Sequence, residues 1–397
     1  MVIGRRLKQM RLARGMSLDA LAAALGGAIT KQGLSKYELG KSEPSPRILA
    51  LLAAALGVKA MHLAVPPEVE VSFIGYRRRA SLPKREQERV ESQVAEALER
   101  RVQLQDRLQL CPTIDLAVES IAIARVEDAE EASAQVRAQW KLGTAPLASV
   151  TATLEDHLVH VLEIDADERF DGISAVVRMR DGHVAAAAVV SDEKVVGERQ
   201  RLNLAHELGH LVLDVSALAD TQVELAAFRF GAALLAPAAL IRQEVGTTRS
   251  SISANELLLL KQRFGMSIQA LVRRLRDLEI ITASYYKQWC IDINRMGWRR
   301  DEPGRIPREE PTWLRRHVLR GLAEELISAE EASALVPGLA EATPSLSLLQ
   351  RRAFLALPLE ERRRIMAEQA IQMTSDYVPD PDWQDFSDDI IDNAPDK

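Results

Sequence analysis

The stretch Leu204-Ala205-His206-Glu207-Leu208-Gly209-His210-Leu211-Val212-Leu213 carries the pattern His-Glu-x-x-His inside an apolar run of helical period. Four residues are slightly more than one turn of an α-helix, so His206 and His210 emerge on one face and can share one metal ion. Glu207 lies beside the first histidine, where its carboxylate can take a proton from water. Zinc suits this set, because it binds two neutral imidazoles and one carboxylate and leaves a fourth position open.

The alternative for this stretch is an ordinary helix that happens to carry two surface histidines. Five apolar residues surround the motif, namely Leu204, Ala205, Leu208, Leu211 and Val212. A helix this apolar would bury its histidines, and buried imidazoles need partners. We therefore favour a zinc site.

Two blocks of the sequence resemble the ImmA/IrrE-type metallopeptidases. Residues 198–210 read Glu-Arg-Gln-Arg-Leu-Asn-Leu-Ala-His-Glu-Leu-Gly-His, and residues 224–237 resemble that family's Glu-x-x-Ala-Asn-x-Phe-Ala-x-x-Leu-Leu-x-Pro helix. Two positions depart from the family pattern: Phe228 replaces Asn or Asp, and Asn203 stands where Thr is common. The resemblance implies a zinc metalloendopeptidase that cleaves repressor-type proteins under stress or during the control of mobile elements. It implies that His206, His210 and Glu224 bind the metal and that Glu207 is catalytic.

Two rivals to the role of Glu224 remain open. Thr221-Gln-Val-Glu224 can be a capping box, in which Glu224 would bond only the start of its own helix. Asp214 lies one turn beyond His210 on the expected helix, where it would orient that histidine rather than bind zinc. Small residues three and seven positions after Glu224, the second being Gly231, favour Glu224, because they let its helix approach the first one closely.

Composition narrows the class of protein. The length of 397 residues predicts about two to four domains, and 47% hydrophobic with 27% charged residues is typical of a soluble globular protein. Cys111 and Cys290 stand far apart, which supports neither a disulfide framework nor a cysteine zinc site. No signal peptide is visible, and no segment reaches the roughly 20 apolar residues of a membrane span. We therefore expect a cytoplasmic protein with no membrane contact.

Charge is unevenly distributed. Residues 1–60 hold ten Lys or Arg and three acids, so this segment is +7 while the remainder is −13. A small basic module on an acidic body indicates a local anionic partner, of which double-stranded DNA is the commonest.

Residues 3–61 are predicted to form a bundle of short helices. Ser17 and Thr30 are placed to cap the helices that begin at residues 18 and 31, and a turn with two glycines separates them. Two helices joined in this way, the second rich in Lys, Gln and Ser, are typical of a module that inserts a recognition helix into the major groove. A basic helical protein–protein module is the alternative.

The whole run resembles the phage-repressor-like (XRE-type) helix-turn-helix family, most specifically at residues 35–44, Ser-Lys-Tyr-Glu-Leu-Gly-Lys-Ser-Glu-Pro. The resemblance implies structural roles for Tyr37 and Glu38. It also implies six DNA-binding residues: Gln32, Ser35 and Lys36 at base edges, and Thr30, Lys31 and Lys41 at phosphates.

The middle of the chain alternates between strand-like and helical patterns. Residues 69–73 alternate as a strand, a basic run at 76–79 follows, and residues 84–110 form a long helix that is a linker or the contact of a homodimer. A helix at 128–140 precedes strands at 160–164, 172–177 and 184–190, the last two joined by an Asp181-Gly182 hairpin. His157, His160 and His183 are expected to be surface or core residues rather than ligands.

The last third of the chain contains no motif that indicates catalysis or ligand binding. Two helices around Gly265-Met-Ser are expected to pack on the peptidase domain rather than to bind DNA. Residues 295–312 are rich in Arg, Pro and Gly, which predicts a linker or exposed loop. Residues 313–358 and 360–374 are helical by pattern, and the tail from residue 380 is acidic.

These observations predict an α+β fold that is mostly α. The expected order is a helix-turn-helix domain at 1–64, a strand and long linker helix at 65–112, a zincin-like peptidase domain with a small sheet at 113–290, and a helical region at 291–397. The favoured function is a DNA-binding transcriptional regulator fused to a zinc endopeptidase. The alternative is a transcription factor or antitoxin-like repressor whose peptidase fold is a non-catalytic sensor.

Overall fold

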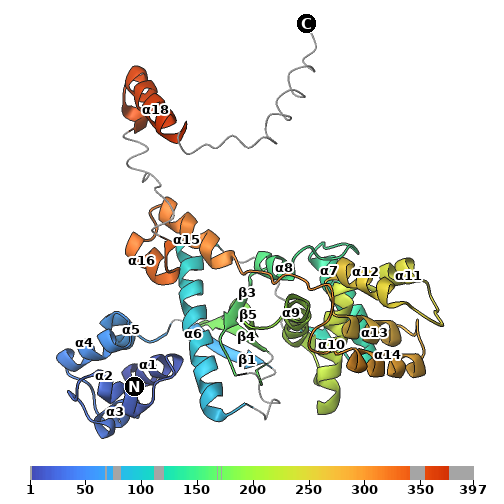
Figure 1. Ribbon diagram of the computed structural model, residues 1–397. Helices are drawn as coiled ribbons and strands as arrows, with labels where there is room; N and C mark the ends of the chain where they lie inside the picture. The colour runs from blue at the N-terminus through green and yellow to red at the C-terminus, as the bar shows by residue number, and fades with distance from the viewer. Residues whose placement is uncertain are drawn as a thin grey trace. The chain divides into compact units, whose positions relative to one another are not determined.

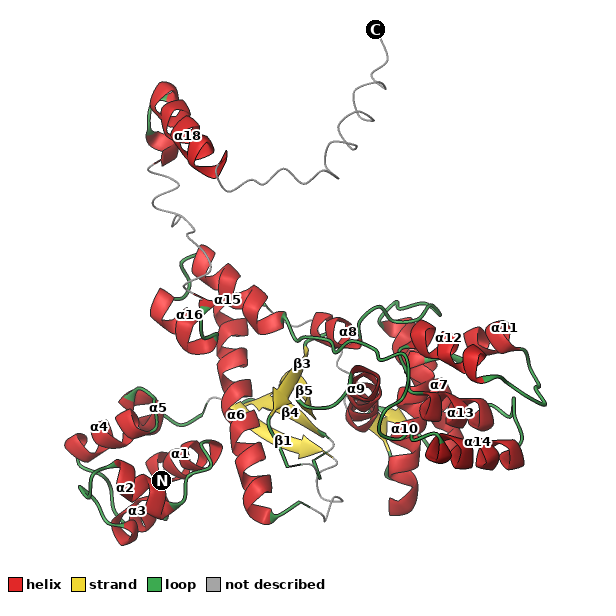
Figure 2. Cartoon of the chain, viewed as in Figure 1, coloured by secondary structure: helices red, strands yellow, loops and turns green. Residues whose placement is uncertain are grey.

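The computed structural model describes residues 2–67, 69–74, 82–110, 120–167, 169–170, 172–339 and 354–374, and Figures 1 and 2 show its elements. It divides into two compact units, residues 1–317 and 318–397. The chain is mostly helical with a small mixed sheet, so the predicted α+β class is confirmed. The basic run at 76–79, Cys111 and the acidic tail lie outside the described residues.

Five short helices form the N-terminal bundle: α1 (Val2–Ala13), α2 (Leu18–Ala24), α3 (Lys31–Glu38), α4 (Pro46–Ala55) and α5 (Ala60–Ala64). Ser17 and Thr30 cap α2 and α3 as expected, each accepting a hydrogen bond from a backbone N–H of the first turn. The core of the bundle consists of fully buried leucines that come from all five helices, namely Leu7, Leu21, Leu34, Leu52 and Leu63.

A four-stranded sheet forms the centre of the first unit. Its order is β1-β4-β5-β3, made by β1 (Val69–Ile74), β4 (Ile173–Met179), β5 (Val184–Asp192) and β3 (Val159–Ile164). The β4–β5 hairpin turns at Gly182, whose φ of +91° suits glycine. Two further strands, β2 (Ile121–Ala122) and β6 (Leu213–Asp214), pair in parallel. Because β1 pairs with β4, the strand expected at 69–73 belongs to the same sheet as the three later strands.

Helix α6 (Lys84–Arg107) covers one face of this sheet (Figure 1). Its apolar stripe, which includes Val90, Val94 and Leu98, is fully buried in a cluster with strand residues. Because this stripe packs against the sheet of the same chain, the long helix is not a free linker. The stripe is also not available as the contact of a homodimer. A homodimer stays a prediction without this contact.

The other face of the sheet carries the largest core and the remaining elements of the first unit. These are η2 (Val126–Asp128), α7 (Ala129–Gln139), α8 (Val150–Asp156), α9 (Gly197–Val212), α10 (Asp220–Leu235), α11 (Ala238–Val245), α12 (Ala254–Phe264), α13 (Ile268–Asp277) and α14 (Ala283–Arg295). Helices α12 and α13 pack into this core, as expected for the pair around Gly265.

The segment after α14 corrects the prediction of a linker or exposed loop at 295–312. Glu302 accepts a hydrogen bond from the fully buried Lys261 over 2.7 Å, and Glu309 pairs with Arg201 at the start of α9. The Arg, Pro and Gly content indicated exposure. A buried cation, however, requires carboxylate partners, and this segment supplies one of the two that Lys261 has, the other being Glu198 of α9.

Three helices follow: α15 (Trp313–Ala323), α16 (Ala329–Leu335) and α18 (Leu359–Thr374). Ser328 and Glu331 form a capping box at the start of α16. Among the described residues no single helix is long and apolar enough to span a membrane, and one bent pair, α10 with α11, reaches that length and hydrophobicity together.

Candidate metal centre and nucleic-acid interface

Helices α9 and α10 approach each other closely because glycine lies at their contact. A Cβ atom added to Gly231 on α10 would lie 2.8 Å from the backbone nitrogen of His206, and one added to Gly209 on α9 would lie 3.2 Å from the Cα of Ala227. Such distances leave no room for a larger residue at Gly231. As expected, the small residues that follow Glu224 in the sequence allow the two helices to approach each other closely.

The structure brings together His206, His210 and Glu224. The two Nε2 atoms of the histidines are 3.0 Å apart, and the Glu224 carboxylate oxygens lie 3.4 Å from Nε2 of His206 and 3.5 Å from Nε2 of His210. Hydrogen bonds with the two histidines hold the pKa of the Glu224 carboxyl well below its usual range. About 41% of the Glu224 side chain is exposed, so the cluster is reachable from solvent.

These separations fit one tetrahedral ion. Ligand atoms about 2.0–2.1 Å from zinc, at tetrahedral corners, lie about 3.3 Å from one another. The three measured separations, 3.0, 3.4 and 3.5 Å, bracket this value. Two imidazoles and one carboxylate are also a ligand set that catalytic zinc uses, with the fourth corner left for water or substrate.

Glu207 lies beside this cluster but is buried, with 3% of the residue exposed. Its carboxylate oxygen Oε2 is 2.7 Å from the hydroxyl of Ser174 on β4, and that hydroxyl is also 2.8 Å from the Glu207 backbone oxygen. A Cβ atom added to Gly172 would lie 2.8 Å from the other carboxylate oxygen, Oε1. Sequence reasoning missed Ser174, because only the packing of β4 against α9 brings it near the motif.

Glu224 does not cap α10, and Asp214 does not lie on α9. Gln222 occupies the capping position of α10, accepting a hydrogen bond from the N–H of Ala219 over 3.3 Å, so Glu224 is not part of a capping box. Helix α9 ends at Val212, and Asp214 lies in β6, where it accepts a hydrogen bond from the N–H of Ser216. The expectation that Asp214 continues the helical face of His210 is wrong, because the chain has already turned into a strand.

The three lone histidines remain apart from this cluster. His157 stacks on Trp140, and His183 pairs with the adjacent Asp181. His160 is fully buried and shares a 2.8 Å hydrogen bond with Gln105. Burial lowers the pKa of His160 well below its ordinary value. Each is thus a core or surface residue, as expected.

Phe228, where the resembled family has a polar residue, is half-buried on α10. The guanidinium of Arg273 lies 5.5 Å from the centre of its ring, which is a cation–π distance. The phenylalanine thus has a packing partner of its own on α13.

The predicted DNA contacts lie on or beside α3. Thr30, Lys31, Gln32, Lys36 and Lys41 are exposed, and Ser35 is half-buried. Thr30 already accepts a hydrogen bond from the N–H of Gly33, and Lys31 pairs with the exposed Asp19 over 2.6 Å.

Two neighbouring residues have structural roles, as expected. Glu38 pairs through both oxygens with Arg11 of α1, and Tyr37 packs against the bundle core. Contacts with α1 and the bundle core therefore fix α3, while the side chains of Gln32 and Lys36 remain exposed.

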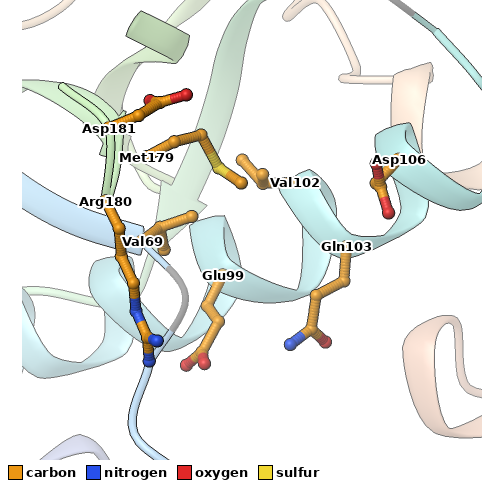
Figure 3. A pocket seen from close by; sticks show the side chains of 8 residues that line it. All are labelled: Val69, Glu99, Val102, Gln103, Asp106, Met179, Arg180 and Asp181. Atoms are coloured by element: carbon orange, nitrogen blue, oxygen red, sulfur yellow. The ribbon is translucent and has the colours of Figure 1, made fainter. Parts of the chain in front are cut away.

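A separate hollow of about 400 Å³ lies on the α6 side of the sheet (Figure 3). Its lining comes from α6, β1 and the β4–β5 hairpin: Val69, Glu99, Val102, Gln103, Asp106, Met179, Arg180 and Asp181. No residue of α9 or α10 lines it, so this hollow is not part of the metal cluster.

Comparison with known proteins matches two segments of the chain. Residues 7–63 match the helix-turn-helix family model, and residues 189–276 match the model of the IrrE N-terminal-like domain. The second range contains the whole metal cluster. The chain therefore carries a helix-turn-helix segment at its N-terminus and a peptidase-family segment further along, which confirms both resemblances.

One curated relative belongs to Bacillus subtilis strain 168. It is an SPbeta prophage-derived uncharacterized helix-turn-helix type transcriptional regulator, YonR, and it is 46% identical over 57 residues. The aligned region is 14% of this chain and 51% of the relative, so the chain spans about half the length of the curated protein it matches.

Proposed function

We propose that this chain is a DNA-binding transcriptional regulator joined to a zinc-dependent endopeptidase whose substrates are repressor-type proteins. The observation that carries the enzymatic half is the convergence of His206, His210 and Glu224 within 4.8 Å of one another, beside the buried Glu207. A chain that acts on DNA and on repressors would work in the cytoplasm.

In this proposal His206, His210 and Glu224 hold zinc. When bound, zinc supplies Lewis-acid chemistry, which acidifies water and polarises a peptide carbonyl. Both histidines must be neutral to act as ligands. Glu207 accepts a proton from the attacking water and returns it to the leaving amine. Ser174 restrains the carboxylate of Glu207 during both transfers.

The DNA-binding half uses the exposed side of α3 and the loop that follows it. Gln32, Ser35 and Lys36 would read base edges in the major groove, and Thr30, Lys31 and Lys41 would bind phosphates. Modules of this size gain affinity when two copies occupy half-sites about one DNA turn apart, so a homodimer belongs to the proposal.

The test is proteolysis by the zinc-loaded full chain. It is incubated with candidate helix-turn-helix repressors, and separately alone, beside a Glu207→Gln variant, and the products are identified by mass spectrometry. We expect cleavage by the wild-type chain, with zinc retained but cleavage lost in Glu207→Gln, because the neighbouring histidines and not this carboxylate bind the metal. His206→Ala should lose both zinc and cleavage.

Two results would count against the enzymatic half. Cleavage by Glu207→Gln at the wild-type rate would remove the proposed role of this residue. Zinc binding without cleavage of any repressor, while DNA binding persists, would favour the alternative of a regulator with a non-catalytic sensor.

A further inference from the structure

The long helix α6 lies directly against the DNA-binding bundle. Arg6 of α1 binds Glu99 of α6 through both guanidinium nitrogens, over 2.5 and 2.9 Å, and both side chains are more than nine-tenths buried. One turn earlier on α6, Glu96 pairs over 3.0 Å with Arg14, which directly follows α1. Buried, bidentate pairs of this kind fix the register of two helices, because either partner alone would be a buried unpaired charge.

This register places the beginning of α6 beside the elements that face DNA. Arg85 donates a hydrogen bond over 3.0 Å to the backbone oxygen of Gly15, in the turn between α1 and α2.

A hollow of about 610 Å³ separates the start of α6 from the bundle, and its lining includes Ser17, Lys31 and Arg85. Ser17 caps α2 and Lys31 begins α3. In helix-turn-helix complexes the first of these two helices crosses the DNA backbone and the second enters the major groove. The hollow therefore opens on the backbone side of the recognition helix.

The charges around this hollow are mostly paired within the protein. Lys31 pairs with Asp19, and Arg89 pairs with Glu86. In contrast, Lys84 and Arg85 are exposed, and within the described ranges neither forms an ion pair with a carboxylate. Arg85 thus lies next to the turn that precedes α2, and Lys84 is its neighbour at the start of α6.

The position of α6 leaves the recognition helix accessible. Gln32 and Lys36 of α3 remain exposed in the full chain. The contact between α6 and the bundle runs along α1 and the α1–α2 turn instead. Helix α6 therefore passes beside the DNA-facing surface and does not cover it.

We propose that Lys84 and Arg85 form an additional DNA-backbone contact, which binds phosphate groups flanking the base pairs that α3 reads. This contact lies outside the matched helix-turn-helix segment, which ends at residue 63. It rests on the proposed DNA-binding function. Because the ligand is the phosphodiester backbone, the contact adds affinity without sequence preference.

The experiment measures the affinity of the full chain for its operator and for a random duplex of equal length, over a range of salt concentrations. The test variant is Lys84→Gln with Arg85→Gln. Each lost phosphate contact reduces the slope of log K against log salt by about 0.9, so the double variant should lose about 1.8 in slope. At about 0.1 M salt each lost contact corresponds to roughly an eightfold loss of affinity on both duplexes.

One variant controls for general charge effects, and a second tests the opposite change of charge at the hollow. Arg107→Gln removes an exposed arginine from the same helix, about 33 Å further along at 1.5 Å per residue, which is several screening lengths away. It should leave both slope and affinity unchanged. Glu88→Gln removes an acid that lines the hollow, and it should strengthen binding, since a phosphate placed there is repelled by this carboxylate.

The results of this experiment distinguish a failure of this inference from a failure of the proposed DNA-binding function. If the wild-type chain binds DNA and the double variant keeps its salt slope, the inference is overturned while DNA binding by the bundle stands. Tighter binding by the double variant also overturns it and would indicate that α6 hinders DNA. If the wild-type chain binds neither duplex at low salt, both the inference and the DNA-binding proposal fail. Circular dichroism verifies that the variants are folded.

Discussion

Ser174, on β4, lies 2.7 Å from the Glu207 carboxylate oxygen Oε2 on α9, with the side chains of both residues buried. The hydroxyl joins the central sheet to α9, the helix that carries His206 and His210, two of the three proposed metal ligands. Gly172 packs against the other carboxylate oxygen, so the carboxylate is restrained on both sides. A general base that is held in place does not lose rotational freedom when the reaction begins.

Ser174→Ala should therefore slow peptide cleavage without weakening zinc binding. A hydrogen bond to a charged group contributes about 1.5–3 kcal/mol, which corresponds to roughly a 10- to 150-fold fall in kcat. KM should change little, because the serine touches Glu207 and not the substrate. Steady-state kinetics with metal content as a second readout measures this effect.

The matched control is Ser191→Ala. Ser191 is also buried on the sheet, but its hydroxyl has no hydrogen-bond partner among the residues that the structure describes. Its loss should leave kcat unchanged. Equal effects of the two substitutions would show that Ser174 acts only through the stability of the sheet.

Glu224→Ala should weaken zinc binding far more than Asp214→Asn. Glu224 places both oxygens within 3.5 Å of the imidazole nitrogens, whereas Asp214 binds the backbone of Ser216. Competition with a chromogenic chelator measures both affinities. The reverse order would move the third ligand to Asp214.

Gly231→Ala should destabilise the protein, because the new methyl group would meet the backbone nitrogen of His206 at 2.8 Å. Overpacking of this kind costs about 1–3 kcal/mol. The same change inside a helix otherwise stabilises by roughly 0.5–1 kcal/mol, so the sign of the effect is informative. Urea denaturation of the metal-free protein gives the free energy of unfolding, and an increase would contradict the close contact of α9 and α10.

Lys31→Ala should weaken binding to all DNA sequences, because lysine binds phosphate and carries no base information. Gln32→Ala should instead reduce the preference for about one base pair, by roughly 1–3 kcal/mol. Competition between the operator and its single-base variants separates the two effects. An equal loss on specific and random duplexes for Gln32→Ala would remove its base-reading role.

Local features of the chain were predictable from its residues alone. The spacing of His206 and His210 follows from helical geometry, and Ser17 and Thr30 cap their helices because the oxygen of each side chain reaches the N–H of the first turn. Gly182 likewise marks the β4–β5 hairpin through its positive φ. Each of these depends on residues a few positions apart, for which backbone geometry is sufficient.

Contacts between distant segments depended on the tertiary structure. The apolar stripe of α6 was visible in the sequence, but an apolar stripe does not say whether it meets a sheet of its own chain or a second copy. The buried Lys261 needed carboxylate partners, and only the folded chain brings Glu198, 63 residues earlier, and Glu302, 41 residues later, to it. Ser174 reaches Glu207 across 33 residues for the same reason. The sequence alone determined the helices of the N-terminal bundle, the caps of α2 and α3 and the His-Glu-x-x-His motif, because these follow from local spacing. The folded chain decided which partners the buried Lys261 and the carboxylate of Glu207 received, because the energies of those contacts depend on packing between remote elements.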